Sequence, residues 1–71
     1  MSTETMPEYQ QRVIQERDSL VKKKTALDGF VSSETFTNVE ETERRRMLRQ
    51  QTVMGEYIDV LNDRINNFPN E

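Results

Sequence analysis

The stretch Tyr9–Val31, YQQRVIQERDSLVKKKTALDGFV, decides the fold of this chain. Wound as an α-helix at about 100° per residue, it places four aliphatic residues on one face: Val13, Leu20, Leu27 and Val31. Two cations fall inside the same arc, because Arg17 lies at about 40° and Lys24 at about 20° from Val13. A charge on a buried face is costly unless it is paired. We therefore expect each cation to meet an anion of this chain, of a neighbouring subunit or of a ligand.

The composition limits the size of the core and the classes of partner. The chain has 71 residues, of which 32% are hydrophobic, so one copy can bury little apolar surface and we expect it to associate with copies of itself. A net charge of −3 argues against a protein that binds DNA or RNA polymers, which normally carries a strong basic excess. No apolar run is long enough to suggest a membrane span or a signal peptide.

The residue types also argue against catalysis. The chain has no histidine and no cysteine, so the commonest general base and the thiol nucleophile are missing, and disulfides are excluded. Its only glycines are Gly29 and Gly55, which rules out a glycine-rich phosphate loop. No spacing typical of a metal site is present. We therefore expect a binding protein that is not an enzyme and uses no cofactor or metal.

The first half of the chain predicts one helix after a flexible lead-in. Residues 1–7 carry no periodicity, and the first helix is expected over 8–28. Gly29 is the expected C-terminal stop, because glycine readily adopts the left-handed conformation that closes many helices.

The second half predicts a helical region over 33–67. Its start is open between a cap at Ser33 and, after a short turn, a capping box that begins at Thr37. Six residues have the spacing of a packing stripe: Met47, Met54, Ile58, Leu61, Ile65 and Phe68. Gln51 interrupts this stripe, either to fix the register or as a tolerated polar residue at its rim. The arginine run at 44–46 is expected to pair with glutamates one turn away on an exposed helix face.

The expected fold is therefore all-α. Residues 1–71 form a single domain, an antiparallel helical hairpin that assembles into a compact homo-oligomer.

Several short motifs follow one another in this order: YxxRVIxE at 9–16, LxxFV at 27–31, SxxF at 33–36, QxxMxxY at 51–57 and LxxRI at 61–65. In this combination the chain resembles the phage anti-CBASS cyclic-oligonucleotide sponge family. The resemblance implies a helical homohexamer in the cytoplasm of the infected bacterial host. It also implies that the protein binds cyclic dinucleotides such as 3′,3′-cGAMP, and in many members cyclic trinucleotides at a separate site, without hydrolysing them.

The resemblance also points to site residues. The family pocket for cyclic dinucleotides takes an aromatic residue and a lysine across a subunit interface, and by position these match Tyr9 and Lys24. Lys23 is the rival, but it points about 80° away from Val13 on the other side, so the periodicity favours Lys24. Thr25 matches a threonine near the family lysine, and Arg64 is the candidate for the trinucleotide site.

A second interpretation needs no small ligand. In it the protein is a structural or regulatory helical oligomer that binds a partner protein through the stripe from Met47 to Phe68. Arg17 and Lys24 would then pair with carboxylates of a neighbouring subunit, such as Glu16 or Asp18.

Overall fold

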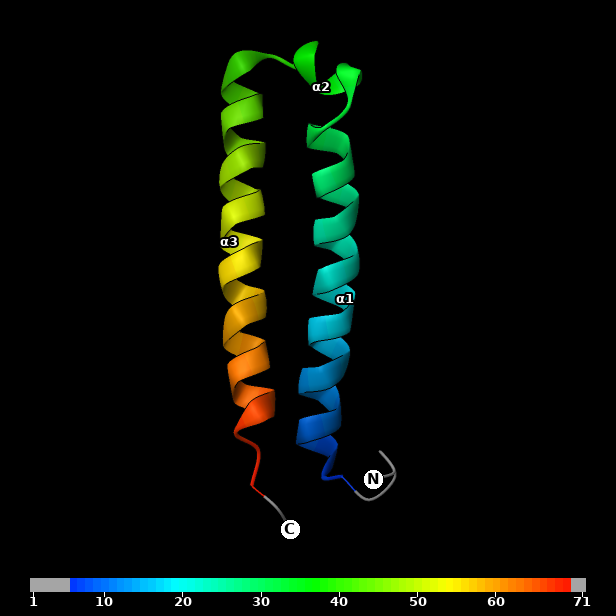
Figure 1. Ribbon diagram of the computed structural model, residues 1–71, viewed down its shortest axis with the longest axis vertical. Helices are drawn as coiled ribbons and strands as arrows, with labels where there is room; N and C mark the ends of the chain where they lie inside the picture. Colours follow the sequence, from blue (N-terminus) through cyan, green and yellow to red (C-terminus); the bar gives the residue numbers. More distant parts are fainter. Residues whose placement is uncertain (1–5, 70–71) are drawn as a thin grey trace.

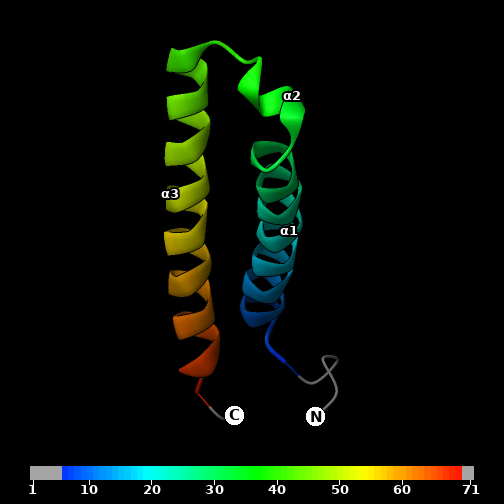
Figure 2. The ribbon, with the colours of Figure 1, turned by 45° about the horizontal axis from the view of Figure 1, so that its top comes forward.

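The computed structural model describes residues 6–69, and these residues form three helices: α1 (Glu8–Val31), α2 (Glu34–Thr37) and α3 (Glu41–Asn66). The two long helices run antiparallel, side by side, along a molecule 51 Å in length, and the one-turn α2 lies where they are joined (Figure 1; Figure 2). The expected all-α hairpin is confirmed. Most of the expected lead-in over 1–7 lies outside the described residues.

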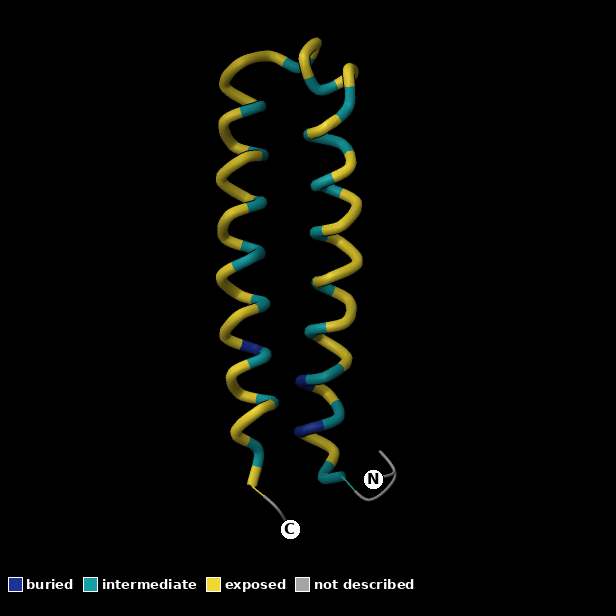
Figure 3. Tube along the Cα trace, in the orientation of Figure 1, coloured by how far each residue is buried: buried dark blue, intermediate teal, exposed yellow. Residues whose placement is uncertain are grey.

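The inner sides of α1 and α3 carry the buried and half-buried residues, whereas their outer sides are exposed (Figure 3). Every member of the predicted stripe from Met47 to Phe68 is buried or half-buried. The stripe therefore packs within the chain, and it is not the free surface that the partner-protein interpretation requires.

Contacts between the two halves of the hairpin fix the register of α1 against α3 at several levels. At the open end of the hairpin, opposite α2, the rings of Tyr9 and Phe68 meet edge to face with centroids 6.1 Å apart. Further along, Arg17 Nη1 donates to Asn62 Oδ1 at 2.9 Å. Nearer to α2, another polar contact, described below, joins α1 to Gln51.

The end of α1 differs from the prediction. The helix continues through Gly29 to Val31, and Gly29 does not adopt a positive φ. The extra turn is stabilised because Phe30 is half-buried and packs edge to face on Phe36, with ring centroids 6.1 Å apart. The hydroxyl of Ser33 donates to the carbonyl of Phe30 at 2.6 Å. Serine hydroxyls thus satisfy terminal carbonyls in place of a left-handed glycine.

The start of the second helical region also differs from both predicted alternatives. Ser33 precedes α2, but its hydroxyl bonds backward to α1 and does not cap α2. Glu40, expected inside a capping box from Thr37, is instead the N-terminal cap of α3, because its side chain accepts from the backbone N–H of Thr42 at 3.3 Å. The hydroxyl of Thr42 donates to the same carboxylate, and this bond, followed by the backbone bond, holds the pKa of the Glu40 carboxyl below its ordinary value.

The arginine run behaves largely as expected. Arg45 pairs with Glu41 at 2.8 Å and Arg46 with Glu43 at 3.0 Å on the exposed side of α3. Arg44 differs, because it is half-buried and its Nε has no hydrogen-bond partner among the described residues.

Candidate functional site

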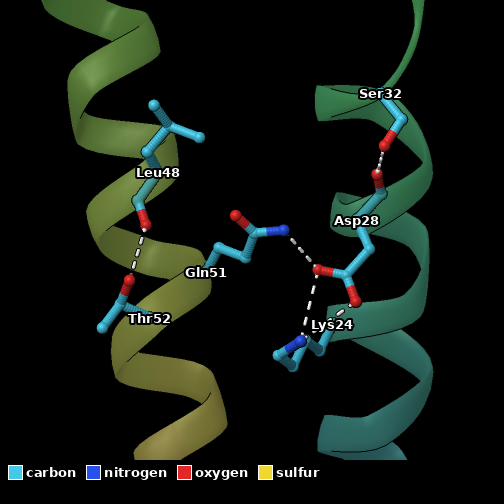
Figure 4. A network of polar contacts seen from close by, with 6 residues as sticks. All are labelled: Lys24, Asp28, Ser32, Leu48, Gln51 and Thr52. Carbon is cyan, nitrogen blue, oxygen red and sulfur yellow. Dashed lines mark hydrogen bonds and ion pairs between the residues drawn. The ribbon is translucent and has the colours of Figure 1, made fainter.

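Four residues form a polar layer between the long helices, and Figure 4 shows three of them: Lys24 and Asp28 on α1, and Gln51 on α3. Lys24 Nζ lies 3.0 Å from Asp28 Oδ2 and 3.3 Å from Oδ1. From the opposite helix, Gln51 Nε2 donates to Asp28 Oδ1 at 2.6 Å. The cation that the periodicity placed on the apolar face is therefore paired with an anion of its own chain.

Gly55 is the fourth residue of the polar layer. A Cβ atom built at this position would lie 3.4 Å from Cε of Lys24, which is the edge of ordinary contact. Glycine in a helix interior is costly relative to alanine. Its absence of a side chain leaves room for the lysine stem beside α3.

The contacts of the polar layer favour the charged form of Asp28. The hydrogen bond from Gln51, followed by the hydrogen bond and charge of Lys24, holds the pKa of the Asp28 carboxyl below its ordinary value. The Lys24 side chain keeps 29% of its surface exposed and that of Asp28 keeps 41%. An ammonium has three N–H donors, and Asp28 engages at most two of them, so one donor remains for another acceptor.

The second cation on the apolar face is also satisfied within the chain. Arg17 pairs with Asp18 at 3.0 Å in addition to its bond with Asn62. Neither Arg17 nor Lys24 therefore needs a carboxylate from another subunit, which was the pairing expected by the partner-protein interpretation.

Tyr9 lies far from Lys24. Its side chain is half-exposed at the start of α1, where one edge packs on Phe68 and the hydroxyl accepts from Gln10 Nε2 at 3.1 Å. Fifteen positions separate Tyr9 from Lys24, which corresponds to about 22 Å along a helix. The structure does not bring these two residues together within one chain.

The remaining predicted site residues are exposed and do not join the polar layer. Thr25 and Lys23 flank Lys24 in sequence, but each points about 100° away around the helix. Arg64 lies in the last turn of α3, where a cation interacts favourably with the helix dipole.

A further cluster lies on the outside of the hairpin. The Tyr57 hydroxyl donates to the Glu16 carboxylate across the two long helices, and this bond raises the pKa of the Tyr57 phenol. Val53 and Val60, one turn to either side of Tyr57 on α3, are 51% and 56% exposed. These three residues form an exposed apolar stripe, which we call the outer stripe.

Sequence reasoning missed Asp28 and Gly55 and left the role of Gln51 open. The spacing of Lys24 and Asp28 is the i, i+4 spacing of helical ion pairs, so this contact could have been found. The bond from Gln51 to Asp28 depends on the register of two distant segments, for which the sequence held no signal.

Two classes of structure are not found among residues 6–69. None of the helices there combines the length and apolar character needed to cross a bilayer. Nor do acidic residues within that range cluster in a way that would hold a metal ion.

Together, the paired helices and the polar layer define a small all-α protein built as a helical hairpin. A comparison with known protein families identifies the family to which the chain belongs. The family model described as Sequestin matches residues 7–67, and the chain therefore belongs to the Sequestin family of anti-CBASS cyclic nucleotide sponges. This is a family of binding proteins and is not known as an enzyme family. Searches of the curated proteins and of the solved structures returned no match.

Proposed function

We propose that this protein binds and sequesters cyclic dinucleotide second messengers of bacterial immunity, such as 3′,3′-cGAMP, and releases them unchanged. The observation that carries the proposal is the family match over residues 7–67, together with a half-exposed ring and a partly exposed ammonium at the positions expected for the pocket. By withholding the messenger in the host cytoplasm, the protein would keep the immune effector inactive.

The two proposed contact residues suit the two parts of this ligand. The ring of Tyr9 offers an aromatic face on which a purine base can stack. The ammonium of Lys24 offers a donor and a positive charge to a phosphate diester. Thr25 would contribute from the rim of the pocket.

Each binding site is proposed to combine residues of two copies of the chain. Tyr9 and Lys24 of one chain are about 22 Å apart along α1, which is too far for one cyclic dinucleotide to touch both. A neighbouring copy that places its own Tyr9 beside Lys24 would complete the pocket. This requirement makes the assembly part of the site.

The composition of the hairpin supports self-association. Among the described apolar residues, only Val13 and Leu61 are buried, so one copy encloses a very small core. The outer stripe of Val53, Tyr57 and Val60 leaves apolar surface that a second copy can cover. We propose a closed homo-oligomer, with the hexamer of the family as its form.

Cyclic trinucleotides are proposed as second ligands, held at a separate site by Arg64. Its guanidinium is exposed near the open end of the hairpin, where copies of the chain can bring several arginines together around one ligand.

Substitution of the two pocket residues tests the proposal. Hydrogen bonds to charged groups contribute about 1.5–3 kcal/mol, so Lys24→Ala should weaken binding of 3′,3′-cGAMP by about tenfold to more than a hundredfold. Tyr9→Ala should weaken it by a similar factor through lost stacking, about 1–3 kcal/mol. Calorimetric titration gives the affinity, and light scattering verifies that the assembly persists.

Lys23→Ala is the matched control, because it removes the same charge from the neighbouring position. It should bind within about twofold of the wild-type chain, since its ammonium points away from the polar layer. Retained affinity in intact assemblies of both the Tyr9→Ala and Lys24→Ala chains would remove these residues from the site.

Mixed assemblies test whether the site is shared between copies. Chains carrying Tyr9→Ala and chains carrying Lys24→Ala, unfolded together and refolded as a mixture, should recover part of the binding that each has lost. Recovery is expected because some pockets then combine an intact Tyr9 of one copy with an intact Lys24 of another. A mixture as inactive as its components would contradict the shared site.

A further inference from the structure

We infer that Asp28 is a built-in counter-anion of the ligand site, which positions the ammonium of Lys24 and competes with the phosphate of the ligand for it. This inference rests on the proposed function, because it assigns a role to a neighbour of the proposed ligand-binding lysine. It makes Asp28 a positioning residue that acts through Lys24.

The contacts of the ammonium support the first part of the role. Both carboxylate oxygens of Asp28 lie within hydrogen-bond distance of Lys24 Nζ, at 3.0 and 3.3 Å. A lysine side chain has four rotatable bonds, and such a two-point contact restricts where its end can lie. Gly55 has no side chain, so the aliphatic stem of Lys24 lies close to α3 in this position.

The position of Asp28 is itself fixed from two sides. Gln51 reaches across from α3 and donates to Oδ1 at 2.6 Å. On its own helix, Lys24 Nζ lies within hydrogen-bond distance of both oxygens of the carboxylate (Figure 4). The carboxylate therefore does not swing freely away when an anion approaches Lys24.

The charges support the second part of the role. A phosphate that bonds to the third N–H of Lys24 comes within a few ångströms of the Asp28 carboxylate, and the two negative charges repel each other at this range. Half-exposed groups are only partly screened by solvent. Removal of the carboxylate charge should therefore tighten binding by about threefold to tenfold.

A purely structural ion pair makes the opposite prediction. Pairs at i, i+4 stabilise isolated helices slightly, and loss of such a pair would leave the affinity unchanged or reduce it. The sign of the change in affinity therefore separates the two roles.

The test is Asp28→Asn, compared with the wild-type assembly by calorimetric titration with 3′,3′-cGAMP at low and at high salt. The introduced amide still offers an oxygen to Lys24, and its nitrogen can donate to Gln51 once that side-chain amide turns over. We expect tighter binding at low salt, by threefold to tenfold, and a smaller gain at high salt.

Glu41→Gln is the matched control. It makes the same change from carboxylate to amide in the i, i+4 pair of Glu41 with Arg45. The position is fourteen residues from Gly55 along α3, about 21 Å, which exceeds the screening length at 0.1 M salt. Its affinity should equal that of the wild-type chain.

A ligand-free measurement tests the contact itself. The pKa of the Asp28 carboxyl, followed by carbon NMR, should lie below the ordinary value in the wild-type chain and rise in Lys24→Ala and Gln51→Leu chains. An ordinary wild-type pKa would show that the contact does not persist in solution and would overturn the inference.

The outcomes for this inference and for the proposed function are distinct. In one outcome, the wild-type chain binds the cyclic dinucleotide, Lys24→Ala does not, and Asp28→Asn binds no more tightly than wild type. Asp28 then does not compete with the ligand, and this inference is overturned while the proposed function stands. A gain of equal size in Glu41→Gln would trace the effect to net charge and would also overturn it. A wild-type assembly that binds no cyclic dinucleotide would overturn the proposed function and this inference with it.

Discussion

The two ends of the hairpin are built on different principles. Near the open end, Gln10, Val13 and Leu61 are buried, and we call this group the open-end layer. Toward α2, the polar layer of Lys24, Asp28, Gln51 and Gly55 fills the same interface with half-exposed charges and amides. Figure 3 shows this difference directly, since the buried colour is confined to the open-end half of the molecule.

The difference indicates that one part of this very small fold supplies most of its stability and another part presents charged groups to a ligand. Burial of apolar surface supplies most of the stability of helices that pack in pairs. Exposed ion pairs contribute little to stability but can present charge to a ligand. We therefore expect substitutions in the open-end layer to change folding, and substitutions in the polar layer to change binding.

The largest expected effect on stability is that of Leu61→Ala. Leu61 has no exposed surface, and removal of a buried leucine side chain costs about 2–5 kcal/mol. In a hairpin with so few buried residues this is enough to unfold most of the chain at moderate temperature. Thermal unfolding followed by circular dichroism, at one fixed protein concentration, measures the change.

Leu48→Ala is the control for that experiment. It removes the same side chain from the same helix at a position that is 45% exposed, and such surface changes usually stay within about 0.5 kcal/mol. Equal losses from the two substitutions would contradict the assignment of stability to the open-end layer.

An intermediate change in the free energy of unfolding, toward greater stability, is expected for Gly55→Ala. Alanine is favoured over glycine in a helix interior by about 1 kcal/mol, and the new methyl group would touch only the flexible stem of Lys24. The free energy of unfolding should therefore rise by up to about 1 kcal/mol. Binding of the ligand should change little, because the methyl group meets the lysine stem at 3.4 Å, an ordinary contact distance. Denaturant unfolding and calorimetric titration of the same protein sharpen the comparison.

Gly29→Ala provides the reference. A methyl group there would meet nothing within 4 Å, so it reports helix propensity alone. If Gly55→Ala weakened binding more than Gly29→Ala, the missing side chain beside Lys24 would have a role in the site.

The smallest change in stability is expected when the pH is lowered. The pKa of Asp28 is lowered in the fold, so this carboxylate contributes stability above its unfolded pKa of about 3.9 and loses that contribution as the pH falls through the lower folded value. The open-end layer has no titratable member. Protection of the backbone amides against exchange, measured relative to the intrinsic exchange rate at each pH, should therefore fall around the polar layer before it falls around Leu61 as the pH drops below about 4.

Asp28→Asn should abolish that local difference, because the introduced amide does not titrate in this range. If amide protection in the wild-type chain fell uniformly along the whole hairpin, the polar layer would not open separately from the open-end layer.

Local rules predicted much of this fold from sequence. The spacing of apolar residues gave both long helices and the stripe from Met47 to Phe68, and the i, i+3 and i, i+4 rules gave the pairs of Arg45 and Arg46. The stop at Gly29 was wrong because packing of Phe30 outweighed the local preference of glycine for helix ends.

The contacts that could not be predicted all join distant segments. The bonds of Arg17 to Asn62 and of Gln51 to Asp28 depend on the register of α1 against α3. That register is set by the connection at 32–40. The sequence predicted a helix start at Ser33 or at Thr37, whereas the connection contains the one-turn α2 and the N-terminal cap of α3 at Glu40. The pairing of Lys24 with Asp28 does not depend on this register, because both residues lie one turn apart on α1, and the spacing alone could have identified it.

The central claim is that this chain captures cyclic dinucleotides without chemical change. The most direct test is to titrate the purified protein with 3′,3′-cGAMP by calorimetry, heat the complex, and analyse the released nucleotide. We predict tight binding, lost in the Lys24→Ala chain, and recovery of the intact nucleotide. A well-folded assembly that binds none of a panel of cyclic di- and trinucleotides, or one that returns cleaved nucleotide, would contradict the account.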